Sequence, residues 1–164
     1  MSGLVSNFMD ADHTYLDKLW TKFLGEENNP EKSSNLLKRF KQHLLLHIRL
    51  EDNFLFPLLN SHINMGVNPG LLAMAIRDHR NIIKLLVMVE EASLGGDIGK
   101  VKITSRHLQH ALKKHRRRED EIHYPVCDFF IEPKEWNSAL FKIYGRRLNK
   151  DARGGNKYLK KIYN

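Results

Sequence analysis

An all-helical fold is predicted for this chain of 164 residues, namely an antiparallel four-helix bundle with up-down-up-down order. Two observations predict it. Leu, Ile, Phe and Met recur at helical spacing in four long segments, and breaks rich in Pro, Gly and Asn separate these segments. The alternating pattern of a strand hairpin does not occur along the sequence, which argues against a β fold.

The first two helices are expected to form a hairpin. Residues 6–25 form the first, which ends at the sequence EENNP of residues 26–30 because Asn and Pro favour a turn. Residues 33–60 form the second, which ends before the Gly- and Pro-containing sequence of residues 65–70. The inward stripe of the first helix comprises Met9, Leu16, Trp20 and Leu24, and that of the second comprises Phe40, Leu44, Phe54 and Leu58.

The next two helices are expected to form a second hairpin. Residues 69–94 form the third helix, which ends at the sequence GGDIG of residues 95–99, and residues 100–130 form the fourth. The inward stripe of the fourth comprises Leu108, Ala111, Leu112 and Ile122. Four amphipathic helices with short connections are typical of an up-down-up-down bundle. A shorter fifth helix is expected over residues 134–148, with three residues packed against the bundle: Trp136, Leu140 and Phe141.

Positive charge is concentrated at the C-terminus. The chain has a formal net charge of +8, and residues 142–164 contain eight basic residues and a single acid, Asp151. We therefore expect two parts, a bundle domain at residues 1–132 and a C-terminal helix with a basic tail at residues 133–164. Such a tail either docks an anionic macromolecule or is simply a solvated segment.

The composition excludes several classes of protein. The single cysteine, Cys127, rules out an internal disulfide, a zinc ribbon and a CxxC redox motif, and we expect it to be a structural thiol. No apolar run approaches the ~18–20 residues of a membrane span. The N-terminus lacks the basic and apolar regions of a secretory signal. These observations favour a cytoplasmic location.

Two motifs, an Asp-His pair and a His-x-x-x-Glu-Asp stretch followed by proline, occur once in each half of the chain. The Asp-His pair occurs as Asp12-His13 and again as Asp78-His79. The longer motif occurs as residues 47–52 (HIRLED) with Pro57, and again as residues 115–120 (HRRRED) with Pro125. A duplicated pattern of this kind is far more specific than any single histidine, and it indicates a repeated helical hairpin.

The histidines and glutamates of these motifs are predicted to meet in the core. The two residues of each His-x-x-x-Glu motif share one face of their helix, together with apolar residues. Counted from the helix ends at ~1.5 Å per residue, the four histidines stand at one height of an antiparallel bundle, within about a turn. The predicted layer consists of six residues: His13, His47, Glu51, His79, His115 and Glu119.

A buried layer of this composition favours a metal site. Unpaired carboxylates are costly to bury, and two of them also repel each other, so two cations would resolve both problems. Imidazole and carboxylate together suit iron, with manganese or zinc as alternatives. Inward-facing His and Glu residues in a helical bundle are an established way to build a di-iron site.

These motifs resemble the signature of the hemerythrin-like proteins, also called the HHE cation-binding family, over roughly residues 6–130. In that signature a His on the first and third helices accompanies His-x-x-x-Glu on the second and fourth. The resemblance implies four terminal iron ligands, which are His13, His47, His79 and His115. It also implies two carboxylates that bridge the irons, Glu51 and Glu119.

Two positions distinguish the chain from oxygen-carrying hemerythrins. These have a fifth histidine where this chain has Ala75. They also place an aspartate five residues after the fourth-helix histidine, whereas His115 of this chain is followed by both Glu119 at four residues and Asp120 at five. Glu119 is nevertheless the expected ligand, because it mirrors Glu51 and lies on the inward face. The set of four His and two Glu is closest to that of the repair-of-iron-centres di-iron proteins, which are linked to nitric oxide stress and iron–sulfur cluster repair.

This ligand set implies small-molecule chemistry. Two His per iron, two bridging carboxylates and an oxo or hydroxo bridge leave one open position on each iron. Because apolar side chains around the layer leave little room, we expect a ligand the size of dioxygen, nitric oxide or peroxide. The protein would bind or reduce it as a sensor, carrier or detoxifier. Iron donation in cluster repair and a non-enzymatic binding module are the alternatives, and enzymatic activity, as a peroxide- or nitric-oxide-reducing oxidoreductase, is left open.

Further polar residues lie near the predicted layer or on the surface. Asp17 and His43 are expected one layer from the irons, either as an ion pair or proton path or as two separate residues in contact with water. The remaining histidines are expected at the surface: His62, His107, His110 and His123.

Overall fold

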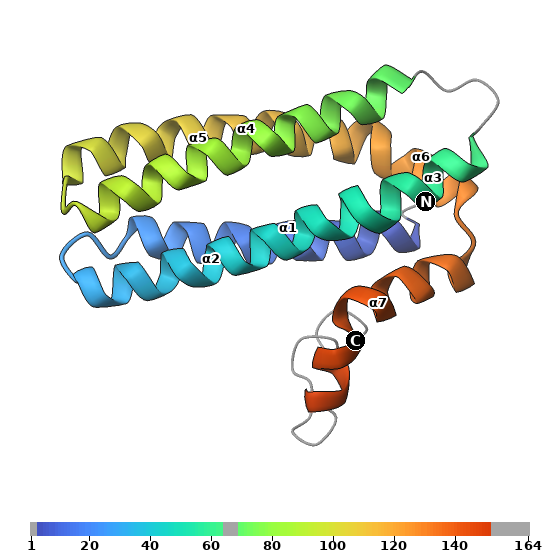
Figure 1. The fold of residues 1–164 in the computed structure, drawn as a ribbon, viewed down its shortest axis with the longest axis horizontal. Helices are drawn as coiled ribbons and strands as arrows, with labels where there is room; N and C mark the ends of the chain where they lie inside the picture. Colours follow the sequence, from blue (N-terminus) through green and yellow to red (C-terminus); the bar gives the residue numbers. More distant parts are fainter. Residues whose placement is uncertain (1–2, 64–68, 152–164) are drawn as a thin grey trace.

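The computed structural model describes residues 3–63 and 69–151, and its regular elements within these ranges are all helices (Figure 1). The predicted all-helical class is confirmed, and the arrangement is that of a helical bundle. Most of the expected break at residues 65–70 and most of the basic tail, residues 152–164, lie outside the described residues. Within the described ranges, no helix combines the length and apolar character that a membrane crossing requires.

The first hairpin consists of α1 (Leu4–Leu24) and α2 (Pro30–Leu50), which lie side by side (Figure 1). The Asn29 side chain accepts a hydrogen bond from the backbone N–H of Lys32 at 3.1 Å, and Pro30 stands in the first turn of α2. Both features favour a helix start, so the predicted break separates the two helices through ordinary capping chemistry.

The second hairpin consists of α4 (Pro69–Leu94) and α5 (Ile98–Arg118). The bounds of α4 are those predicted from the sequence. The chain reverses at Gly96, whose φ of 67° lies in the left-handed region that favours glycine. The side chain of Asp97 then caps α5 by accepting the backbone N–H of Lys100 at 2.9 Å.

The second and fourth predicted helices each contain one π-helical turn. They are interrupted at η1 (Glu51–Leu55) and η2 (Glu119–His123), which lead into α3 (Phe56–His62) and α6 (Tyr124–Phe130). Each π turn precedes a proline, Pro57 or Pro125, which lacks an N–H and would clash with the carbonyl four residues earlier in an α-helix. The wider turn relieves this clash, and the backbone N–H of Phe56 instead donates to the carbonyl of Glu51.

The π turn in the first half changes which residues face the core. Leu55 and Leu59 are 0% and 1% exposed, whereas Phe54 and Leu58, which helical spacing placed inward, are only partly buried. The extra residue in the turn rotates the following helix by about one position. The predicted stripe is therefore correct before Glu51 and displaced by one residue after it.

The fifth predicted helix is α7 (Pro133–Asp151), which contacts α2 and η1. Trp136 and Leu140 are buried as expected, and the Trp136 ring packs edge-on against Phe8 with centroids 5.5 Å apart. Phe141 is 62% exposed, contrary to the prediction. It follows Leu140 directly, so it is turned by about 100° from the face that meets the bundle.

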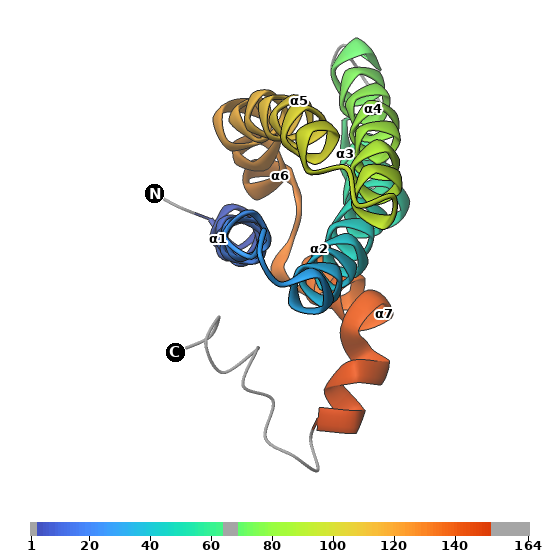
Figure 2. The ribbon, with the colours of Figure 1, turned by 90° about the vertical axis from the view of Figure 1, so that its left-hand side faces the viewer.

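Two apolar clusters fill the bundle, whose helices are seen end-on in Figure 2. We call the cluster that lies toward α3, α6 and α7 the lower cluster. We call the cluster that lies toward the α1–α2 and α4–α5 connections the upper cluster. Large members of the lower cluster are Phe8, Leu50, Phe56 and Trp136, and those of the upper cluster are Trp20, Phe40, Leu44, Ile82 and Leu108. A buried polar layer lies between the two clusters.

Candidate metal centre

The buried polar layer contains all six residues that the sequence predicted to converge. Each is at most 6% exposed, although each has an ionisable side chain. The two hairpins contribute equally, with His13, His47 and Glu51 from the first and His79, His115 and Glu119 from the second. The layer is therefore shared between the two halves of the duplicated chain.

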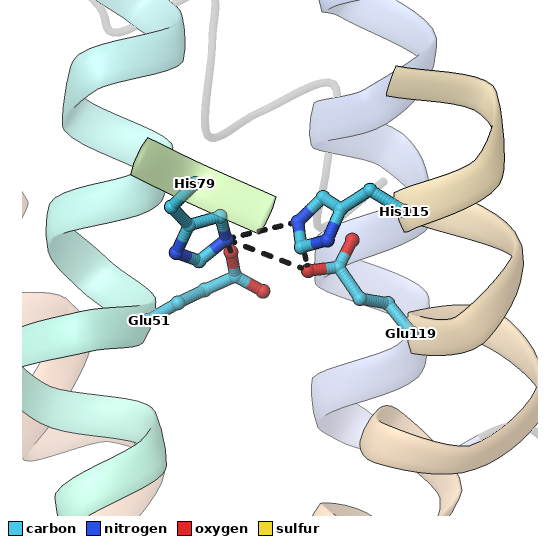
Figure 3. Close-up of side chains that lie close together, drawn as sticks. All are labelled: Glu51, His79, His115 and Glu119. Carbon is cyan, nitrogen blue, oxygen red and sulfur yellow. Dashed lines mark hydrogen bonds and ion pairs between the residues drawn. The ribbon is translucent and has the colours of Figure 1, made fainter. Parts of the chain in front are cut away.

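Four of these side chains form one compact group (Figure 3). Potential ligand atoms of Glu51, His79, His115 and Glu119 all lie within 4.8 Å of one another. The Nε2 atoms of His79 and His115 face each other at 2.9 Å, and Oε1 of Glu119 lies 2.7 Å from His115 Nε2. Oε2 of Glu51 lies 3.2 Å from His79 Nε2. Nitrogen and oxygen donors from both hairpins thus converge on one small volume.

A second group consists of His13, His47 and Glu119. The Nε2 atom of His13 lies 3.4 Å from Oε2 of Glu119, and the Nε2 atom of His47 lies 3.4 Å from Oε2 of Glu51. Glu119 therefore belongs to both groups, with Oε1 directed to one and Oε2 to the other. Each carboxylate lies between histidines of the two hairpins, which is the position a bridging ligand requires.

The donor set fits a pair of cations. Oε2 of Glu51 and both carboxylate oxygens of Glu119 are buried, and histidine Nε2 atoms lie 2.7–3.4 Å from them. Buried carboxylates are costly unless a positive charge compensates them, and a cation in contact with the carboxylates and the imidazoles would do so. Imidazole nitrogen together with carboxylate oxygen is a donor set of transition metals.

An aspartate stands beside the outward-facing Nδ1 atom of each histidine in the layer. The Oδ to Nδ1 distances are 2.8 Å for Asp12 and His47, 2.7 Å for Asp52 and His79, 3.5 Å for Asp78 and His115, and 3.7 Å for Asp120 and His13. A carboxylate within hydrogen-bond distance of Nδ1, as Asp12 and Asp52 are, fixes the tautomer and directs Nε2 toward the site, whereas Asp78 and Asp120 lie farther from their histidines. The sequence interpretation assigned these aspartates no such role. The signal for it was present in the sequence, since all four aspartates belong to the duplicated motifs.

The structure gives Asp17 and His43 partners other than each other. Nε2 of His43 lies 2.6 Å from Oδ1 of Asp12, and Oδ2 of Asp17 accepts a hydrogen bond from Nη1 of Arg116 at 2.5 Å. Asp12 and Asp17 are five residues apart, which turns them about 140° from each other around α1. Asp12 therefore faces α2 and Asp17 faces α5.

Mutual electrostatics stabilise this layer in the absence of metal. Burial disfavours the charged form of His13, but contacts with Asp120 and Glu119 outweigh it and raise the pKa of His13 to about 9. At His79, burial is likewise outweighed by neighbouring carboxylates, first by Asp52, and the pKa is raised to about 11. Burial opposes ionisation of Glu119, but the surrounding histidines lower its pKa well below the usual value. A cation that enters the layer replaces these protons.

The two halves of the centre differ in the aromatic residue that follows each π turn. Tyr124 corresponds to Phe56 in the duplicated pattern, since each precedes a proline. The Tyr124 hydroxyl donates a hydrogen bond to Oε1 of Glu51 at 2.8 Å and lies 3.5 Å from Nε2 of His13. The Phe56 ring stacks on His79, with centroids 6.2 Å apart. The sequence interpretation missed Tyr124, for which the repeat of an aromatic residue before proline was the available signal.

His123 is buried, contrary to the prediction that it lies at the surface. It is 1% exposed, whereas Ile122, predicted to face inward, is 41% exposed. The cause is η2, which rotates the helix after Glu119 by about one position. Burial lowers the pKa of His123. His62, His107 and His110 are exposed as predicted, and Cys127 is fully buried.

An open cavity of about 670 Å³ adjoins the layer on the side of the upper cluster. His13, His47 and His115 line its inner end, together with apolar side chains, and charged residues line its mouth between α1 and α5. At that mouth Arg116 pairs with Asp17 and, at 3.1 Å, with Asp10. The expectation of little room is therefore wrong on this side, because the cavity reaches three of the four histidines of the layer.

The profile of the hemerythrin HHE cation binding domain matches residues 4–127. The chain belongs to the hemerythrin HHE cation-binding family. No curated protein and no solved structure matches it. The part that matches the HHE domain contains the six residues of the buried layer, both π turns and the four aspartates beside the histidines. The His and Glu layer is thus a part of the cation-binding domain, and α7 lies beyond the match.

We expect Asp12→Asn to weaken metal binding about 10–100-fold, because the carboxylate that orients His47 is lost. Asp17→Asn on the same helix removes the same charge from a side chain that is 69% exposed, and should bind metal as the parent does. Competition for Zn²⁺ with a chromogenic chelator measures both affinities. Equal affinity of Asp12→Asn and the parent would show that His47 needs no support from Asp12.

Proposed function

We propose that this HHE-domain protein is a non-haem di-iron protein that binds or reduces dioxygen, nitric oxide or peroxide, as a sensor, carrier or detoxifier. The observation that carries the proposal is the convergence of two groups of buried His and Glu donors that share Glu119. Three of the four histidines also border a cavity that opens to the solvent. A small molecule therefore has both a centre to bind and a path to it.

The proposed ligands divide between two positions. His13 and His47 would hold one ion, His79 and His115 would hold the other, and Glu51 and Glu119 would bridge the two. Iron is proposed because a mixed set of imidazole and carboxylate suits it, with manganese and zinc as alternatives. A bound iron pair would supply open coordination positions and reversible oxidation. The chain itself orients His47 and His79 through Asp12 and Asp52, and the Tyr124 hydroxyl donates a hydrogen bond to Glu51.

The arrangement of the long helices supports the same proposal. We propose the up-down-up-down order of a hemerythrin-like bundle, in which two similar hairpins each supply two histidines and one glutamate. Each hairpin is seen in the pairing of α1 with α2 and of α4 with α5. In this order the bridging glutamates join the two hairpins, so the ions would hold together the halves of the duplicated chain.

Metal analysis combined with an optical spectrum tests the proposed function. The purified protein should hold two irons per chain, and its near-ultraviolet absorption should change when nitric oxide or peroxide is added. Two zinc ions and no response to either ligand would overturn the redox proposal. Transfer of iron to an apo cluster protein, without turnover of either ligand, would instead favour iron donation for cluster repair.

Ala75→His is expected to slow the oxidation of the reduced protein by air. Ala75 is fully buried and one helical turn before His79, so the new imidazole would approach the proposed position of His79 and His115 and occupy its open site. The larger side chain should also cost about 1–3 kcal/mol of stability through overpacking. Stopped-flow mixing with air-saturated buffer measures the rate. An unchanged rate in a folded variant that holds two irons would show that the alanine does not set the reactivity.

A further inference from the structure

His123 is a buried histidine that is not a member of the predicted ligand set and is not one of the histidines beside the four aspartates. Its side chain is 1% exposed, and neither Nδ1 nor Nε2 has a hydrogen-bond partner among the described residues. A neutral imidazole has one donor and one acceptor, and burying both without partners is unfavourable. The position of His123 therefore calls for a partner that the described part of the chain does not supply.

The first half of the duplicated chain shows which residue stands at the position equivalent to His123. His123 stands four residues after Glu119 at the end of η2, and its counterpart four residues after Glu51 at the end of η1 is Leu55. Leu55 is fully buried in the lower apolar cluster. A leucine thus satisfies the packing at this place in the fold, so packing alone does not explain a histidine there.

The surroundings of His123 place it beside one half of the centre. Its ring makes an edge contact with Phe56, with centroids 5.7 Å apart, and Phe56 also stacks on the His79 ring, with centroids 6.2 Å apart. The charges of Glu119 and Glu51 act on His123. An imidazole whose two nitrogens lack partners among the described residues therefore lies near the His79 side of the layer, at the end of the π turn that begins with Glu119.

We propose that His123 is an additional imidazole ligand of the metal centre, on the side of His79 and His115. The inference rests on the proposed metal centre and adds to its ligand set. The nitrogens of His123 are not part of the two groups whose atoms lie within 4.8 Å of one another, so the ring must turn toward the ions when they bind. The two metal positions then differ, with three imidazoles at one and two imidazoles beside Tyr124 at the other.

Titration of the metal-free protein with Co²⁺ alone tests the proposal, with His123→Leu as the principal variant. Leucine is the residue of the counterpart position, so the variant should fold. Two changes of opposite sign are expected. The melting temperature of the metal-free variant should be equal to or higher than that of the parent, because an unpaired polar ring is removed. The affinity for one of the two Co²⁺ ions should fall at least about tenfold, and its visible absorption bands should shift.

Two further variants make the result specific. His110→Leu removes an exposed histidine from α5 and should leave both Co²⁺ affinities and the absorption bands unchanged. His123→Gln keeps a polar side chain but removes the imidazole, so it should lose Co²⁺ affinity as His123→Leu does, even if the leucine variant folds poorly.

The outcomes separate this inference from the proposed function. Binding of two Co²⁺ ions by His123→Leu and His123→Gln, with parental affinity and absorption bands, would overturn the role of His123 and leave the metal centre intact. Failure of the parent protein to bind any Co²⁺ would overturn the metal centre and this inference together. A higher melting temperature of metal-free His123→Leu without any change in Co²⁺ binding would assign His123 no role at the centre.

Discussion

Glu119→Ala is expected to abolish the two-metal centre, with fewer than two ions bound per chain. Glu119 is the one residue that belongs to both groups of potential ligands in the described part of the chain. Its removal takes one carboxylate oxygen from each position, and it also leaves the histidines of the layer without one of the two glutamates that face them. Glu51→Ala should have a similar effect, because Glu51 also lies between histidines of the two hairpins.

Asp120→Ala is the matched control for this prediction. Asp120 adjoins Glu119 in sequence, but its side chain is 40% exposed and its oxygen lies 3.7 Å from His13 Nδ1, which is longer than a hydrogen bond. The variant should therefore retain two ions, as measured by elemental analysis after reconstitution and dialysis, with circular dichroism to verify the helical content. If Asp120→Ala loses its ions and Glu119→Ala keeps two, Asp120 is the bridging residue.

Removal of the metal by a chelator is expected to lower the melting temperature by about 10 °C or more. An ion present at 1,000 times its dissociation constant stabilises the folded state by about 4 kcal/mol, and each kcal/mol shifts the melting temperature of a domain of this size by about 2–4 °C. The expected effect is large because donors of each position come from both hairpins, so the ions oppose their separation. Calorimetry with and without chelator measures the shift, and an unchanged melting temperature would contradict metal binding by the folded layer.

The stabilisation by metal should increase as the pH rises from 6.5 to 8.5. In the metal-free protein the pKa values of His13 and His79 are raised to about 9 and about 11, from 6.5 in the unfolded chain. Their own contribution to stability is therefore complete below pH 6.5 and is lost as the pH rises through these folded-state values. Metal must displace both protons, which becomes easier as the pH rises. Calorimetry with excess Mn²⁺ at the two pH values tests this, and a shift that decreases with pH would contradict it.

The sequence by itself determined the helical class and the membership of the buried layer. Helical spacing fixes which residues of one α-helix share a face, so His47 with Glu51 and His115 with Glu119 could be placed together without knowledge of any neighbour. The bounds of α4 followed from Pro69 and from the glycines after Leu94. The duplication supplied the remaining constraint, because two copies of one hairpin place their histidines at the same height.

Only the tertiary structure decided what depends on two helices at once or on an irregular turn. The pairing of His43 with Asp12 depends on how far α1 is rotated against α2, which no spacing within one helix specifies. The burial of His123 depends on η2, where relief of the clash at Pro125 displaces the inward face by one residue. Sequence periodicity assumes a constant 3.6 residues per turn, so it fails at the π turns, which are also where the two glutamates of the layer lie.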